Sequence, residues 1–242
     1  MTKRKDTKAK AFTCRGAAAL ITAALLTAAV LLTGCPQSIE NKPNIPSGPD
    51  PNLRIEGGVL KGYNEWPSGA LVIPAGVTEI AGSAFSGCTS LTQVNFPASL
   101  TKIGSDAFSG CTGLTQVDFS QCTGLTTIGE SAFYGCTGLT SLSLPASLER
   151  LGKSAFRDCT EITGTVAIPA SLKYIDYYAF ENCNKVDAFD FTQCTQLTEI
   201  SYMAFAECKE DAIFTVKAGG NIKNLLLDSK SGIKASQIRE VP

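Results

Sequence analysis

Residues 80–96 read IAGSAFSGCTSLTQVNF, and two near copies follow: IGSDAFSGCTGLTQVDF at 103–119 and IGESAFYGCTGLTSLSL at 128–144. The motif Ala-Phe-x-x-Cys occurs six times, with its phenylalanines at spacings of 23, 25, 23, 24 and 25 residues. A period in this range is typical of solenoids, in which each unit buries its apolar face against the next. The sequence of 242 residues therefore predicts a repeat solenoid, built on Phe85, Phe108, Phe133, Phe156, Phe180 and Phe205.

Each unit combines a strand pattern with a turn. The segment Leu91-x-x-Val94-x-Phe96 has apolar residues that alternate at its end, and Pro97 follows at once. Alternation predicts a short strand with one buried face, which proline ends. The apolar pair Leu100 and Ile103 comes next, and Ala-Phe then falls in a predicted turn or short helix. The expected architecture is a stack of short parallel strands, mainly β and irregular, in which replacing Phe133 with alanine costs more stability than replacing Phe205 near the end.

These LxxLxL units with an Ile-x-x-x-Ala-Phe-x-x-Cys-x-x-Leu return resemble the bacterial surface-antigen, or BspA-like, type of leucine-rich repeat over residues 58–220. The resemblance implies a leucine-rich-repeat stack that attaches to host matrix proteins, host cells or other bacteria. The pattern is lost at both edges of this region. We therefore expect an N-terminal cap at 57–70, repeats at 71–216 and a C-terminal cap at 217–242.

The N-terminus has the pattern of an export signal. A basic start is followed by an uncharged, Ala- and Leu-rich run at 16–34. The run ends in Leu-Thr-Gly-Cys35, which resembles the lipobox of bacterial lipoproteins. This resemblance implies that signal peptide 1–34 is removed, that Cys35 is lipidated, and that the exported chain is anchored to the cell envelope, at the outer membrane or cell surface. An uncleaved membrane anchor is the alternative. Residues 35–56 are expected to form a flexible, proline-rich tether.

Composition narrows the function classes. The chain has no histidine, which excludes Ser-His-Asp and Cys-His catalysis and histidine metal sites. With 21 basic and 22 acidic side chains it lacks the basic excess of nucleic-acid binders. The carboxylates of Asp118 and Asp190 lie three predicted rungs apart, too far for paired acid–base work. The sequence predicts neither an enzyme nor a cofactor or metal site.

The cysteine after each repeat phenylalanine would form a ladder with one thiol per rung. Neighbouring strands lie about 4.8 Å apart, which exceeds the usual Cβ separation in a disulfide. The ladder is therefore interpreted as buried free thiols, with disulfides or a thiolate metal site as the alternatives. Cys122 and Cys194, in two longer links, lie too far apart to pair with each other.

Two sets of residues are candidates for partner binding. Alternation places Gln93, Asn95, Gln116 and Asp118 on the open face of the strands. The second set could form a contact patch or could pack under the C-terminal cap; it comprises Tyr174, Tyr177, Tyr178, Tyr202 and Met203. The sequence predicts a module that binds an extracellular protein or glycan of unknown identity and contacts the membrane through its N-terminal lipid. The alternative is a structural or antigenic spacer of the envelope without a specific ligand.

Overall fold

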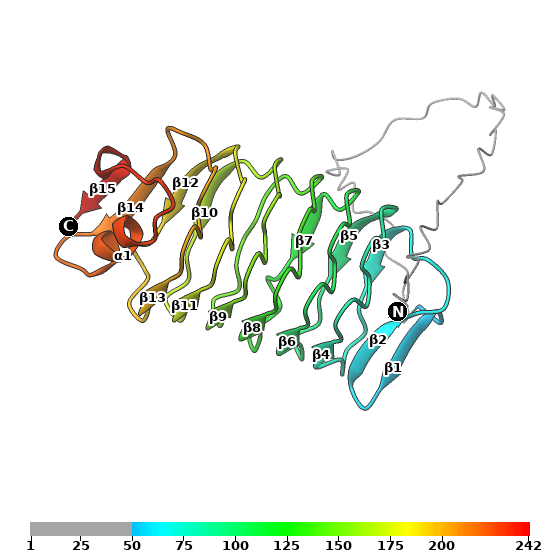
Figure 1. Cartoon of the computed structure of the whole chain (residues 1–242). Coiled ribbons are helices and arrows are strands. Elements are labelled where there is room, and N and C mark those ends of the chain that lie inside the picture. The colour runs from blue at the N-terminus through cyan, green and yellow to red at the C-terminus, as the bar shows by residue number, and fades with distance from the viewer. Residues whose placement is uncertain (1–49) are drawn as a thin grey trace, which may run out of the picture. The chain divides into compact units, whose positions relative to one another are not determined.

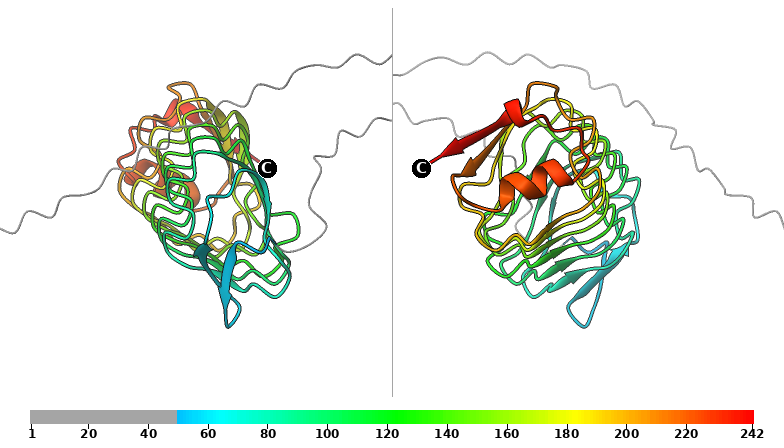
Figure 2. Two further views of the ribbon diagram at one scale, coloured as in Figure 1. Left: turned by 90° about the vertical axis from the view of Figure 1, so that its right-hand side faces the viewer. Right: turned by 60° about the vertical axis from the view of Figure 1, so that its left-hand side comes forward.

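The computed structural model describes residues 50–242, so the predicted signal peptide, Cys35 and most of the predicted tether lie outside the described residues. These residues form a parallel β-solenoid with little helix, which confirms the predicted fold class (Figure 1). Successive rungs lie one behind another, and seen along the stack they nearly superimpose (Figure 2). Pairing in register, for example Val94 with Val117, places equivalent side chains of successive repeats side by side.

One side of the coil carries the strands expected from the alternating pattern, but in two separate sheets. The break falls at residues 141–144, where the alternation Ser-Leu-Ser-Leu predicted a strand and the structure has none. The first sheet contains β3 (Gly69–Val72), β5 (Leu91–Asn95) and β7 (Gln116–Asp118). The second contains β10 (Gly164–Ala167), β12 (Val186–Asp190), β14 (Ile213–Lys217) and β15 (Ile238–Val241).

A second side of the coil carries the longest sheet, with eight strands, which the sequence did not predict. Six of its strands have only two residues each, and each ends on the second residue of the second apolar pair of its repeat, such as Ile103. Two residues are too few to show an alternating pattern, so sequence periodicity could not identify them. The six strands are β4 (Glu79–Ile80), β6 (Lys102–Ile103), β8 (Thr127–Ile128), β9 (Arg150–Leu151), β11 (Tyr174–Ile175) and β13 (Glu199–Ile200).

Each Ala-Phe pair lies in a turn rather than a helix, and the turns are themselves hydrogen-bonded from rung to rung. The amide of Phe133 donates to the carbonyl of Ala155 at 2.8 Å, and the same bond recurs from Phe85 to Phe180. In every copy the residues two before and two after the phenylalanine have positive φ. These left-handed residues reverse the chain sharply enough to direct the ring inward.

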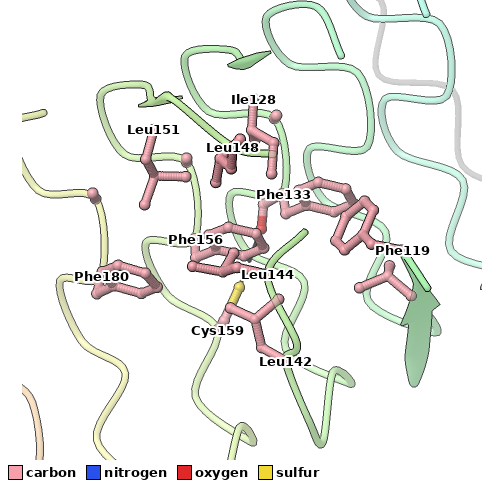
Figure 3. Close-up of a cluster of buried hydrophobic side chains, with 14 of the residues drawn as sticks. Phe119, Ile128, Phe133, Leu142, Leu144, Leu148, Leu151, Phe156, Cys159 and Phe180 are labelled. Atoms are coloured by element: carbon pink, nitrogen blue, oxygen red, sulfur yellow. Dashed lines mark hydrogen bonds between the residues drawn. The ribbon is translucent and has the colours of Figure 1, made fainter. Parts of the chain in front are cut away.

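The six repeat phenylalanines form a buried stack through the centre of the coil, as predicted. Their exposed fractions are 1% or less, and neighbouring rings lie 5.2–5.8 Å apart. Figure 3 shows Phe133, Phe156 and Phe180 in succession, with Leu148 and Leu151 beside them. Phe205 is as buried as Phe133 and contacts four aromatic rings, those of Phe180, Phe189, Phe191 and Phe214, so burial gives no reason for a smaller loss of stability at Phe205.

The N-terminal end is closed by an antiparallel hairpin of β1 (Leu53–Glu56) and β2 (Val59–Tyr63). The strand β1 therefore begins within the segment predicted as tether. Tyr63 continues the phenylalanine stack, with its ring 5.6 Å from that of Phe85, and Trp66 packs on Tyr63 at 5.1 Å. The ordered stack thus starts before the first Ala-Phe copy.

The C-terminal end is closed by residues that take the place of a further rung. Helix α1 (Ile222–Asp228) lies across the end of the coil, and β15 adds in parallel to β14 (Figure 2). The amide of Met203 donates to the carbonyl of Ser229, and that of Phe205 donates to the hydroxyl of Ser231. These two serines satisfy main-chain donors that would otherwise lack a neighbouring rung. Over residues 50–242, none of the helices has the length and apolar character needed to cross a membrane.

Candidate functional site

The four tyrosines singled out in the sequence lie together at the surface, and we call them the tyrosine cluster: Tyr174, Tyr177, Tyr178 and Tyr202. Tyr174 lies on β11, Tyr177 and Tyr178 occupy the turn that follows, and Tyr202 occupies the equivalent turn one rung later. The rings of Tyr177 and Tyr178 are 6.4 Å apart, and Tyr202 meets Tyr178 edge-on at 6.3 Å. Such amphipathic rings are enriched where proteins contact partners.

The C-terminal cap does not cover this cluster. Tyr174, Tyr177 and Tyr202 keep 43%, 48% and 40% of their surface exposed. Tyr178 and Met203 are half-buried, and the amide of Met203 donates to the carbonyl of Ser229 in the cap. The alternative of burial under the cap is therefore wrong for the exposed tyrosines, and the cluster is available at the surface.

Three cations lie over tyrosine rings, and sequence reasoning missed all of them. Arg150 is 6.0 Å from the centre of the Tyr174 ring, Arg157 is 5.5 Å from that of Tyr178, and Lys230 is 5.9 Å from that of Tyr202. A cation over an aromatic face is attracted by the ring quadrupole. Arg150 pairs in register with Tyr174 across β9 and β11, so aligning the repeats would have found it; Lys230 belongs to the cap and has no repeat equivalent.

Arg157 is held beneath the cluster by acidic neighbours. Its Nε lies 2.8 Å from Oε2 of the buried Glu181, although neither atom has a well-directed hydrogen bond. Burial raises the pKa of the Glu181 carboxyl, and the nearby Arg157 charge opposes that rise. Asp158 lies 3.9 Å from the same guanidinium and accepts a hydrogen bond from Asn182. A cation fixed in this way holds the Tyr178 ring in place, which lowers the entropy cost of binding.

The conformation of Tyr178 is unusual for a bulky residue. Its φ is +59°; the four preceding repeats carry small polar residues at the equivalent position, such as Ser131 and Ser154, and the following repeat carries Met203, all with similar angles. Left-handed backbone is uncommon for large side chains, which gain no local hydrogen bond there. The turn itself therefore does not account for a tyrosine at this position.

The polar residues predicted on the open strand face lie on a different side of the coil from the tyrosine cluster. Gln93 and Gln116 pair in register across β5 and β7, as do Asn95 and Asp118, so these four side chains are contiguous. Gln93 donates a 2.9 Å hydrogen bond to Asn95. The structure thus brings together each of the two predicted sets but does not combine them into one site.

The cysteine ladder is a structural feature of the core rather than a reactive site. All eight cysteines within residues 50–242 are free. From the second repeat onward each ladder thiol lies 3.2 Å from the carbonyl of the phenylalanine in the preceding rung, as Cys136 does with Phe108. Burial raises the pKa of Cys136 to about 12, so this thiol stays protonated at neutral pH. The described residues contain no cluster of three side chains able to hold a metal ion.

Comparison with known proteins agrees with the geometry. The search of curated proteins found no match. Among solved structures, the chain is similar to the pneumococcal vaccine antigen PcpA, at 20% identity and a TM-score of 0.61 over 78% of this chain and 46% of that one. It also matches a leucine-rich repeat protein of T. pallidum, at 28% identity and a TM-score of 0.39, covering 58% of this chain and 82% of that one.

A further match is a leucine-rich repeat protein from Bacteroides ovatus, at 17% identity and a TM-score of 0.47, covering 78% of this chain and 64% of that one. The similarity to PcpA supports the solenoid fold and extends over less than half of that antigen. The family described as the BspA type leucine rich repeat region matches six copies, over residues 63–187 and 122–233. The chain therefore belongs to the BspA-type leucine-rich repeat family.

Proposed function

We propose that this chain is a binding module of the bacterial cell envelope, anchored by a lipid on Cys35 and presenting its solenoid to extracellular proteins or glycans. The observation that carries the proposal is the tyrosine cluster, in which three of the four rings are at least 40% exposed and three rings face a cation. Clustered tyrosines and arginines supply much of the binding energy at protein interfaces. Attachment to host matrix, host cells or other bacteria would fit such a surface.

The lipid anchor rests on the sequence alone, because Cys35 lies outside the described residues. The test is expression in a bacterial host with a labelled fatty acid. Wild-type chain should incorporate the label and partition with membranes, whereas Cys35→Ser should do neither. Protease treatment of intact cells should then release peptides from the repeats if the solenoid faces outward. Label on the Cys35→Ser chain, or repeats protected in intact cells, would contradict the anchor or the orientation.

Binding through the tyrosine cluster is tested by replacing its two most accessible turn residues together, Tyr177→Ala with Tyr202→Ala. Immobilised extracellular-matrix proteins and a panel of polysaccharides serve as probes. We expect the double variant to lose at least tenfold in affinity for any bound probe. The matched control, Gln93→Ala with Asn95→Ala, lies on the other side of the coil and should retain affinity. Loss only in the control would move the site to the strand face.

The second candidate function is a structural or antigenic spacer. The continuous rung-to-rung hydrogen bonding favours it, because a rigid rod needs no ligand to separate surfaces. The two functions differ in the same assay. A spacer binds none of the probes, and the tyrosine variant then behaves as wild type.

A further inference from the structure

A groove of about 470 Å³ lies where the strand side of the coil is interrupted. One wall is β7 with the longer link after it, and the other is residues 141–146 of the next rung. Ligand sites commonly have volumes of about 300–1,000 Å³. The groove opens on the same side of the coil as the polar strand face, away from the tyrosine cluster.

The main chain along this groove has unused hydrogen-bonding groups. Strand β7 pairs with β5 and with no other strand. Residues 141–144 form no main-chain hydrogen bond with β7 or β10 in the part of the chain that the structure describes. The rungs rejoin on either side of this segment. The amide of Thr140 donates to the carbonyl of Thr115 at 3.2 Å, and the hydroxyl of Ser147 donates to the carbonyl of Leu125 at 2.8 Å. The break is therefore local: the two rungs stay joined at both ends, and the main-chain groups of β7 that face residues 141–144 are not paired with the next rung.

The floor of the groove is apolar and slightly open. Val117 and Leu142 keep 6% exposure and Leu144 keeps 9%, whereas the equivalent Val94 and Val166 in paired strands keep 0% and 1%. Figure 3 shows Leu142 and Leu144 at the edge of the core cluster. Side chains that enter the groove can therefore reach apolar core atoms that other rungs cover completely.

The rim carries one charge. Asp118 takes part in no ion pair within residues 50–242, and its Oδ1 accepts a 2.8 Å hydrogen bond from the amide of Ser120. The other polar side chains that line the groove are neutral: the amide of Gln116 and the hydroxyls of Ser120, Thr123, Ser141 and Ser143. A ligand that lies here meets a free carboxylate among neutral donors and acceptors, which favours a basic group.

We propose that this groove binds an extended peptide segment of a partner protein, which lies along the outer side of the break and bonds to the main-chain groups that β7 and residues 141–144 leave unpaired. Hydrogen bonds to the main chain hold the peptide, as in other modes of extended-peptide recognition. Alternate apolar side chains of the peptide contact the floor at Val117 and Leu142, and a lysine or arginine between them pairs with Asp118. The proposal rests on the function of a binding module but uses a different surface from the tyrosine cluster, so either site can fail without the other.

The test uses the full-length chain and a labelled heptapeptide with valine at odd positions and threonine, lysine and threonine at even positions. Binding is followed by fluorescence anisotropy, and hydrogen exchange reports on the main chain. We expect saturable binding and slower exchange at residues 116–118 and 141–144. The same peptide with N-methylated valines, which cannot donate main-chain hydrogen bonds, should bind at least tenfold more weakly. The Tyr177→Ala and Tyr202→Ala double variant should bind the peptide normally.

Charge recognition is tested with Asp118→Asn, which keeps an acceptor for the Ser120 amide. Its matched control is Asp190→Asn, because Asp190 occupies the same position on β12 and accepts the same kind of hydrogen bond, from Thr192, in an unbroken sheet. We expect Asp118→Asn to weaken binding about fivefold, as for a single exposed ion pair, and Asp190→Asn to leave it unchanged. Absence of binding at 1 mM peptide, equal binding of the N-methylated peptide, or equal effects of the two substitutions would each overturn the proposal.

Discussion

Alkaline pH should unfold this protein through its thiol ladder, and a single substitution isolates the contribution of one rung. Cys136 is fully buried, and burial raises its pKa to about 12. In the unfolded chain the thiol has an ordinary pKa of about 8.5. Between these values the folded state keeps a proton that the unfolded state has lost, so the free energy of unfolding falls as pH rises. At pH 10 the loss amounts to about 2 kcal/mol for this thiol.

The other buried thiols add to this effect. Burial raises the pKa of Cys208 to about 12, those of Cys122 and Cys194 to about 11, and those of Cys159 and Cys183 well above the usual range. A few such thiols together match the roughly 5–15 kcal/mol by which most domains are stable. We therefore expect the free energy of unfolding of the wild-type chain to fall steeply between about pH 8.5 and pH 10 in reducing buffer, with unfolding at higher pH.

The assay is urea unfolding followed by circular dichroism, in reducing buffer, at steps from pH 7 to pH 10. At pH 7, Cys136→Ala should be about 1–2 kcal/mol less stable than wild type because it leaves a small cavity. This deficit should vanish or reverse by pH 10, because the variant has one thiol fewer to ionise on unfolding. Leu139→Ala, which removes a buried side chain of the same repeat without a titratable group, should keep a constant deficit. Parallel pH profiles for wild type and Cys136→Ala would refute the reasoning.

Four further substitutions test the packing. Phe133→Ala and Phe205→Ala should each cost about 3–5 kcal/mol in denaturant titrations, because both rings are fully buried among aromatic neighbours; a much smaller loss at Phe205 would show that the cap frays. Ser231→Ala should cost about 1 kcal/mol and speed hydrogen exchange at the Phe205 amide, which would then lack its acceptor; unchanged exchange would exclude that role for the cap. Gly138→Ala should destabilise by at least about 2 kcal/mol, since an added Cβ would lie 2.4 Å from the Thr112 carbonyl oxygen; a neutral effect in thermal melts would mean that adjacent rungs can separate.

The core of this fold could be predicted from sequence because it depends on features that repeat. Ala-Phe at a constant offset from cysteine and leucine identified the central stack, and the structure confirms it from Phe85 to Phe205. Each rung needs the same residue type at the same position of the core, so the six copies of the motif together identify that buried position. The eight-stranded sheet escaped prediction because its short strands, such as β6, are formed by stacking and not by a local pattern of their own.

The candidate sites were predicted less completely, for two physical reasons. The tyrosines stood out because they replace polar residues of other copies, but Arg157 lies on the preceding rung and approaches Tyr178 only after stacking. The break at residues 141–144 left no sequence signal, since Leu142 and Leu144 keep the alternation of a strand. Whether residues 141–144 pair as a strand depends on how this rung lies against its two neighbouring rungs. The longer link after β7 and the shorter one after Leu144 differ by two residues, and the groove lies between them.

The tyrosine cluster and the groove beside β7 both lie where a rung departs from the pattern of the others. In a stacked coil the core of each rung is supported by its two neighbours, through the same hydrogen bonds and ring contacts in every copy. A departure on the surface, such as tyrosine in place of serine at position 178, therefore perturbs only one turn while the stack persists. A departure in strand pairing, as beside β7, likewise leaves the phenylalanine stack intact, with Phe133 and Phe156 still 5.2 Å apart. This fold can therefore carry binding functions at little cost in stability at positions where the repeat pattern is broken on the surface and the core remains continuous.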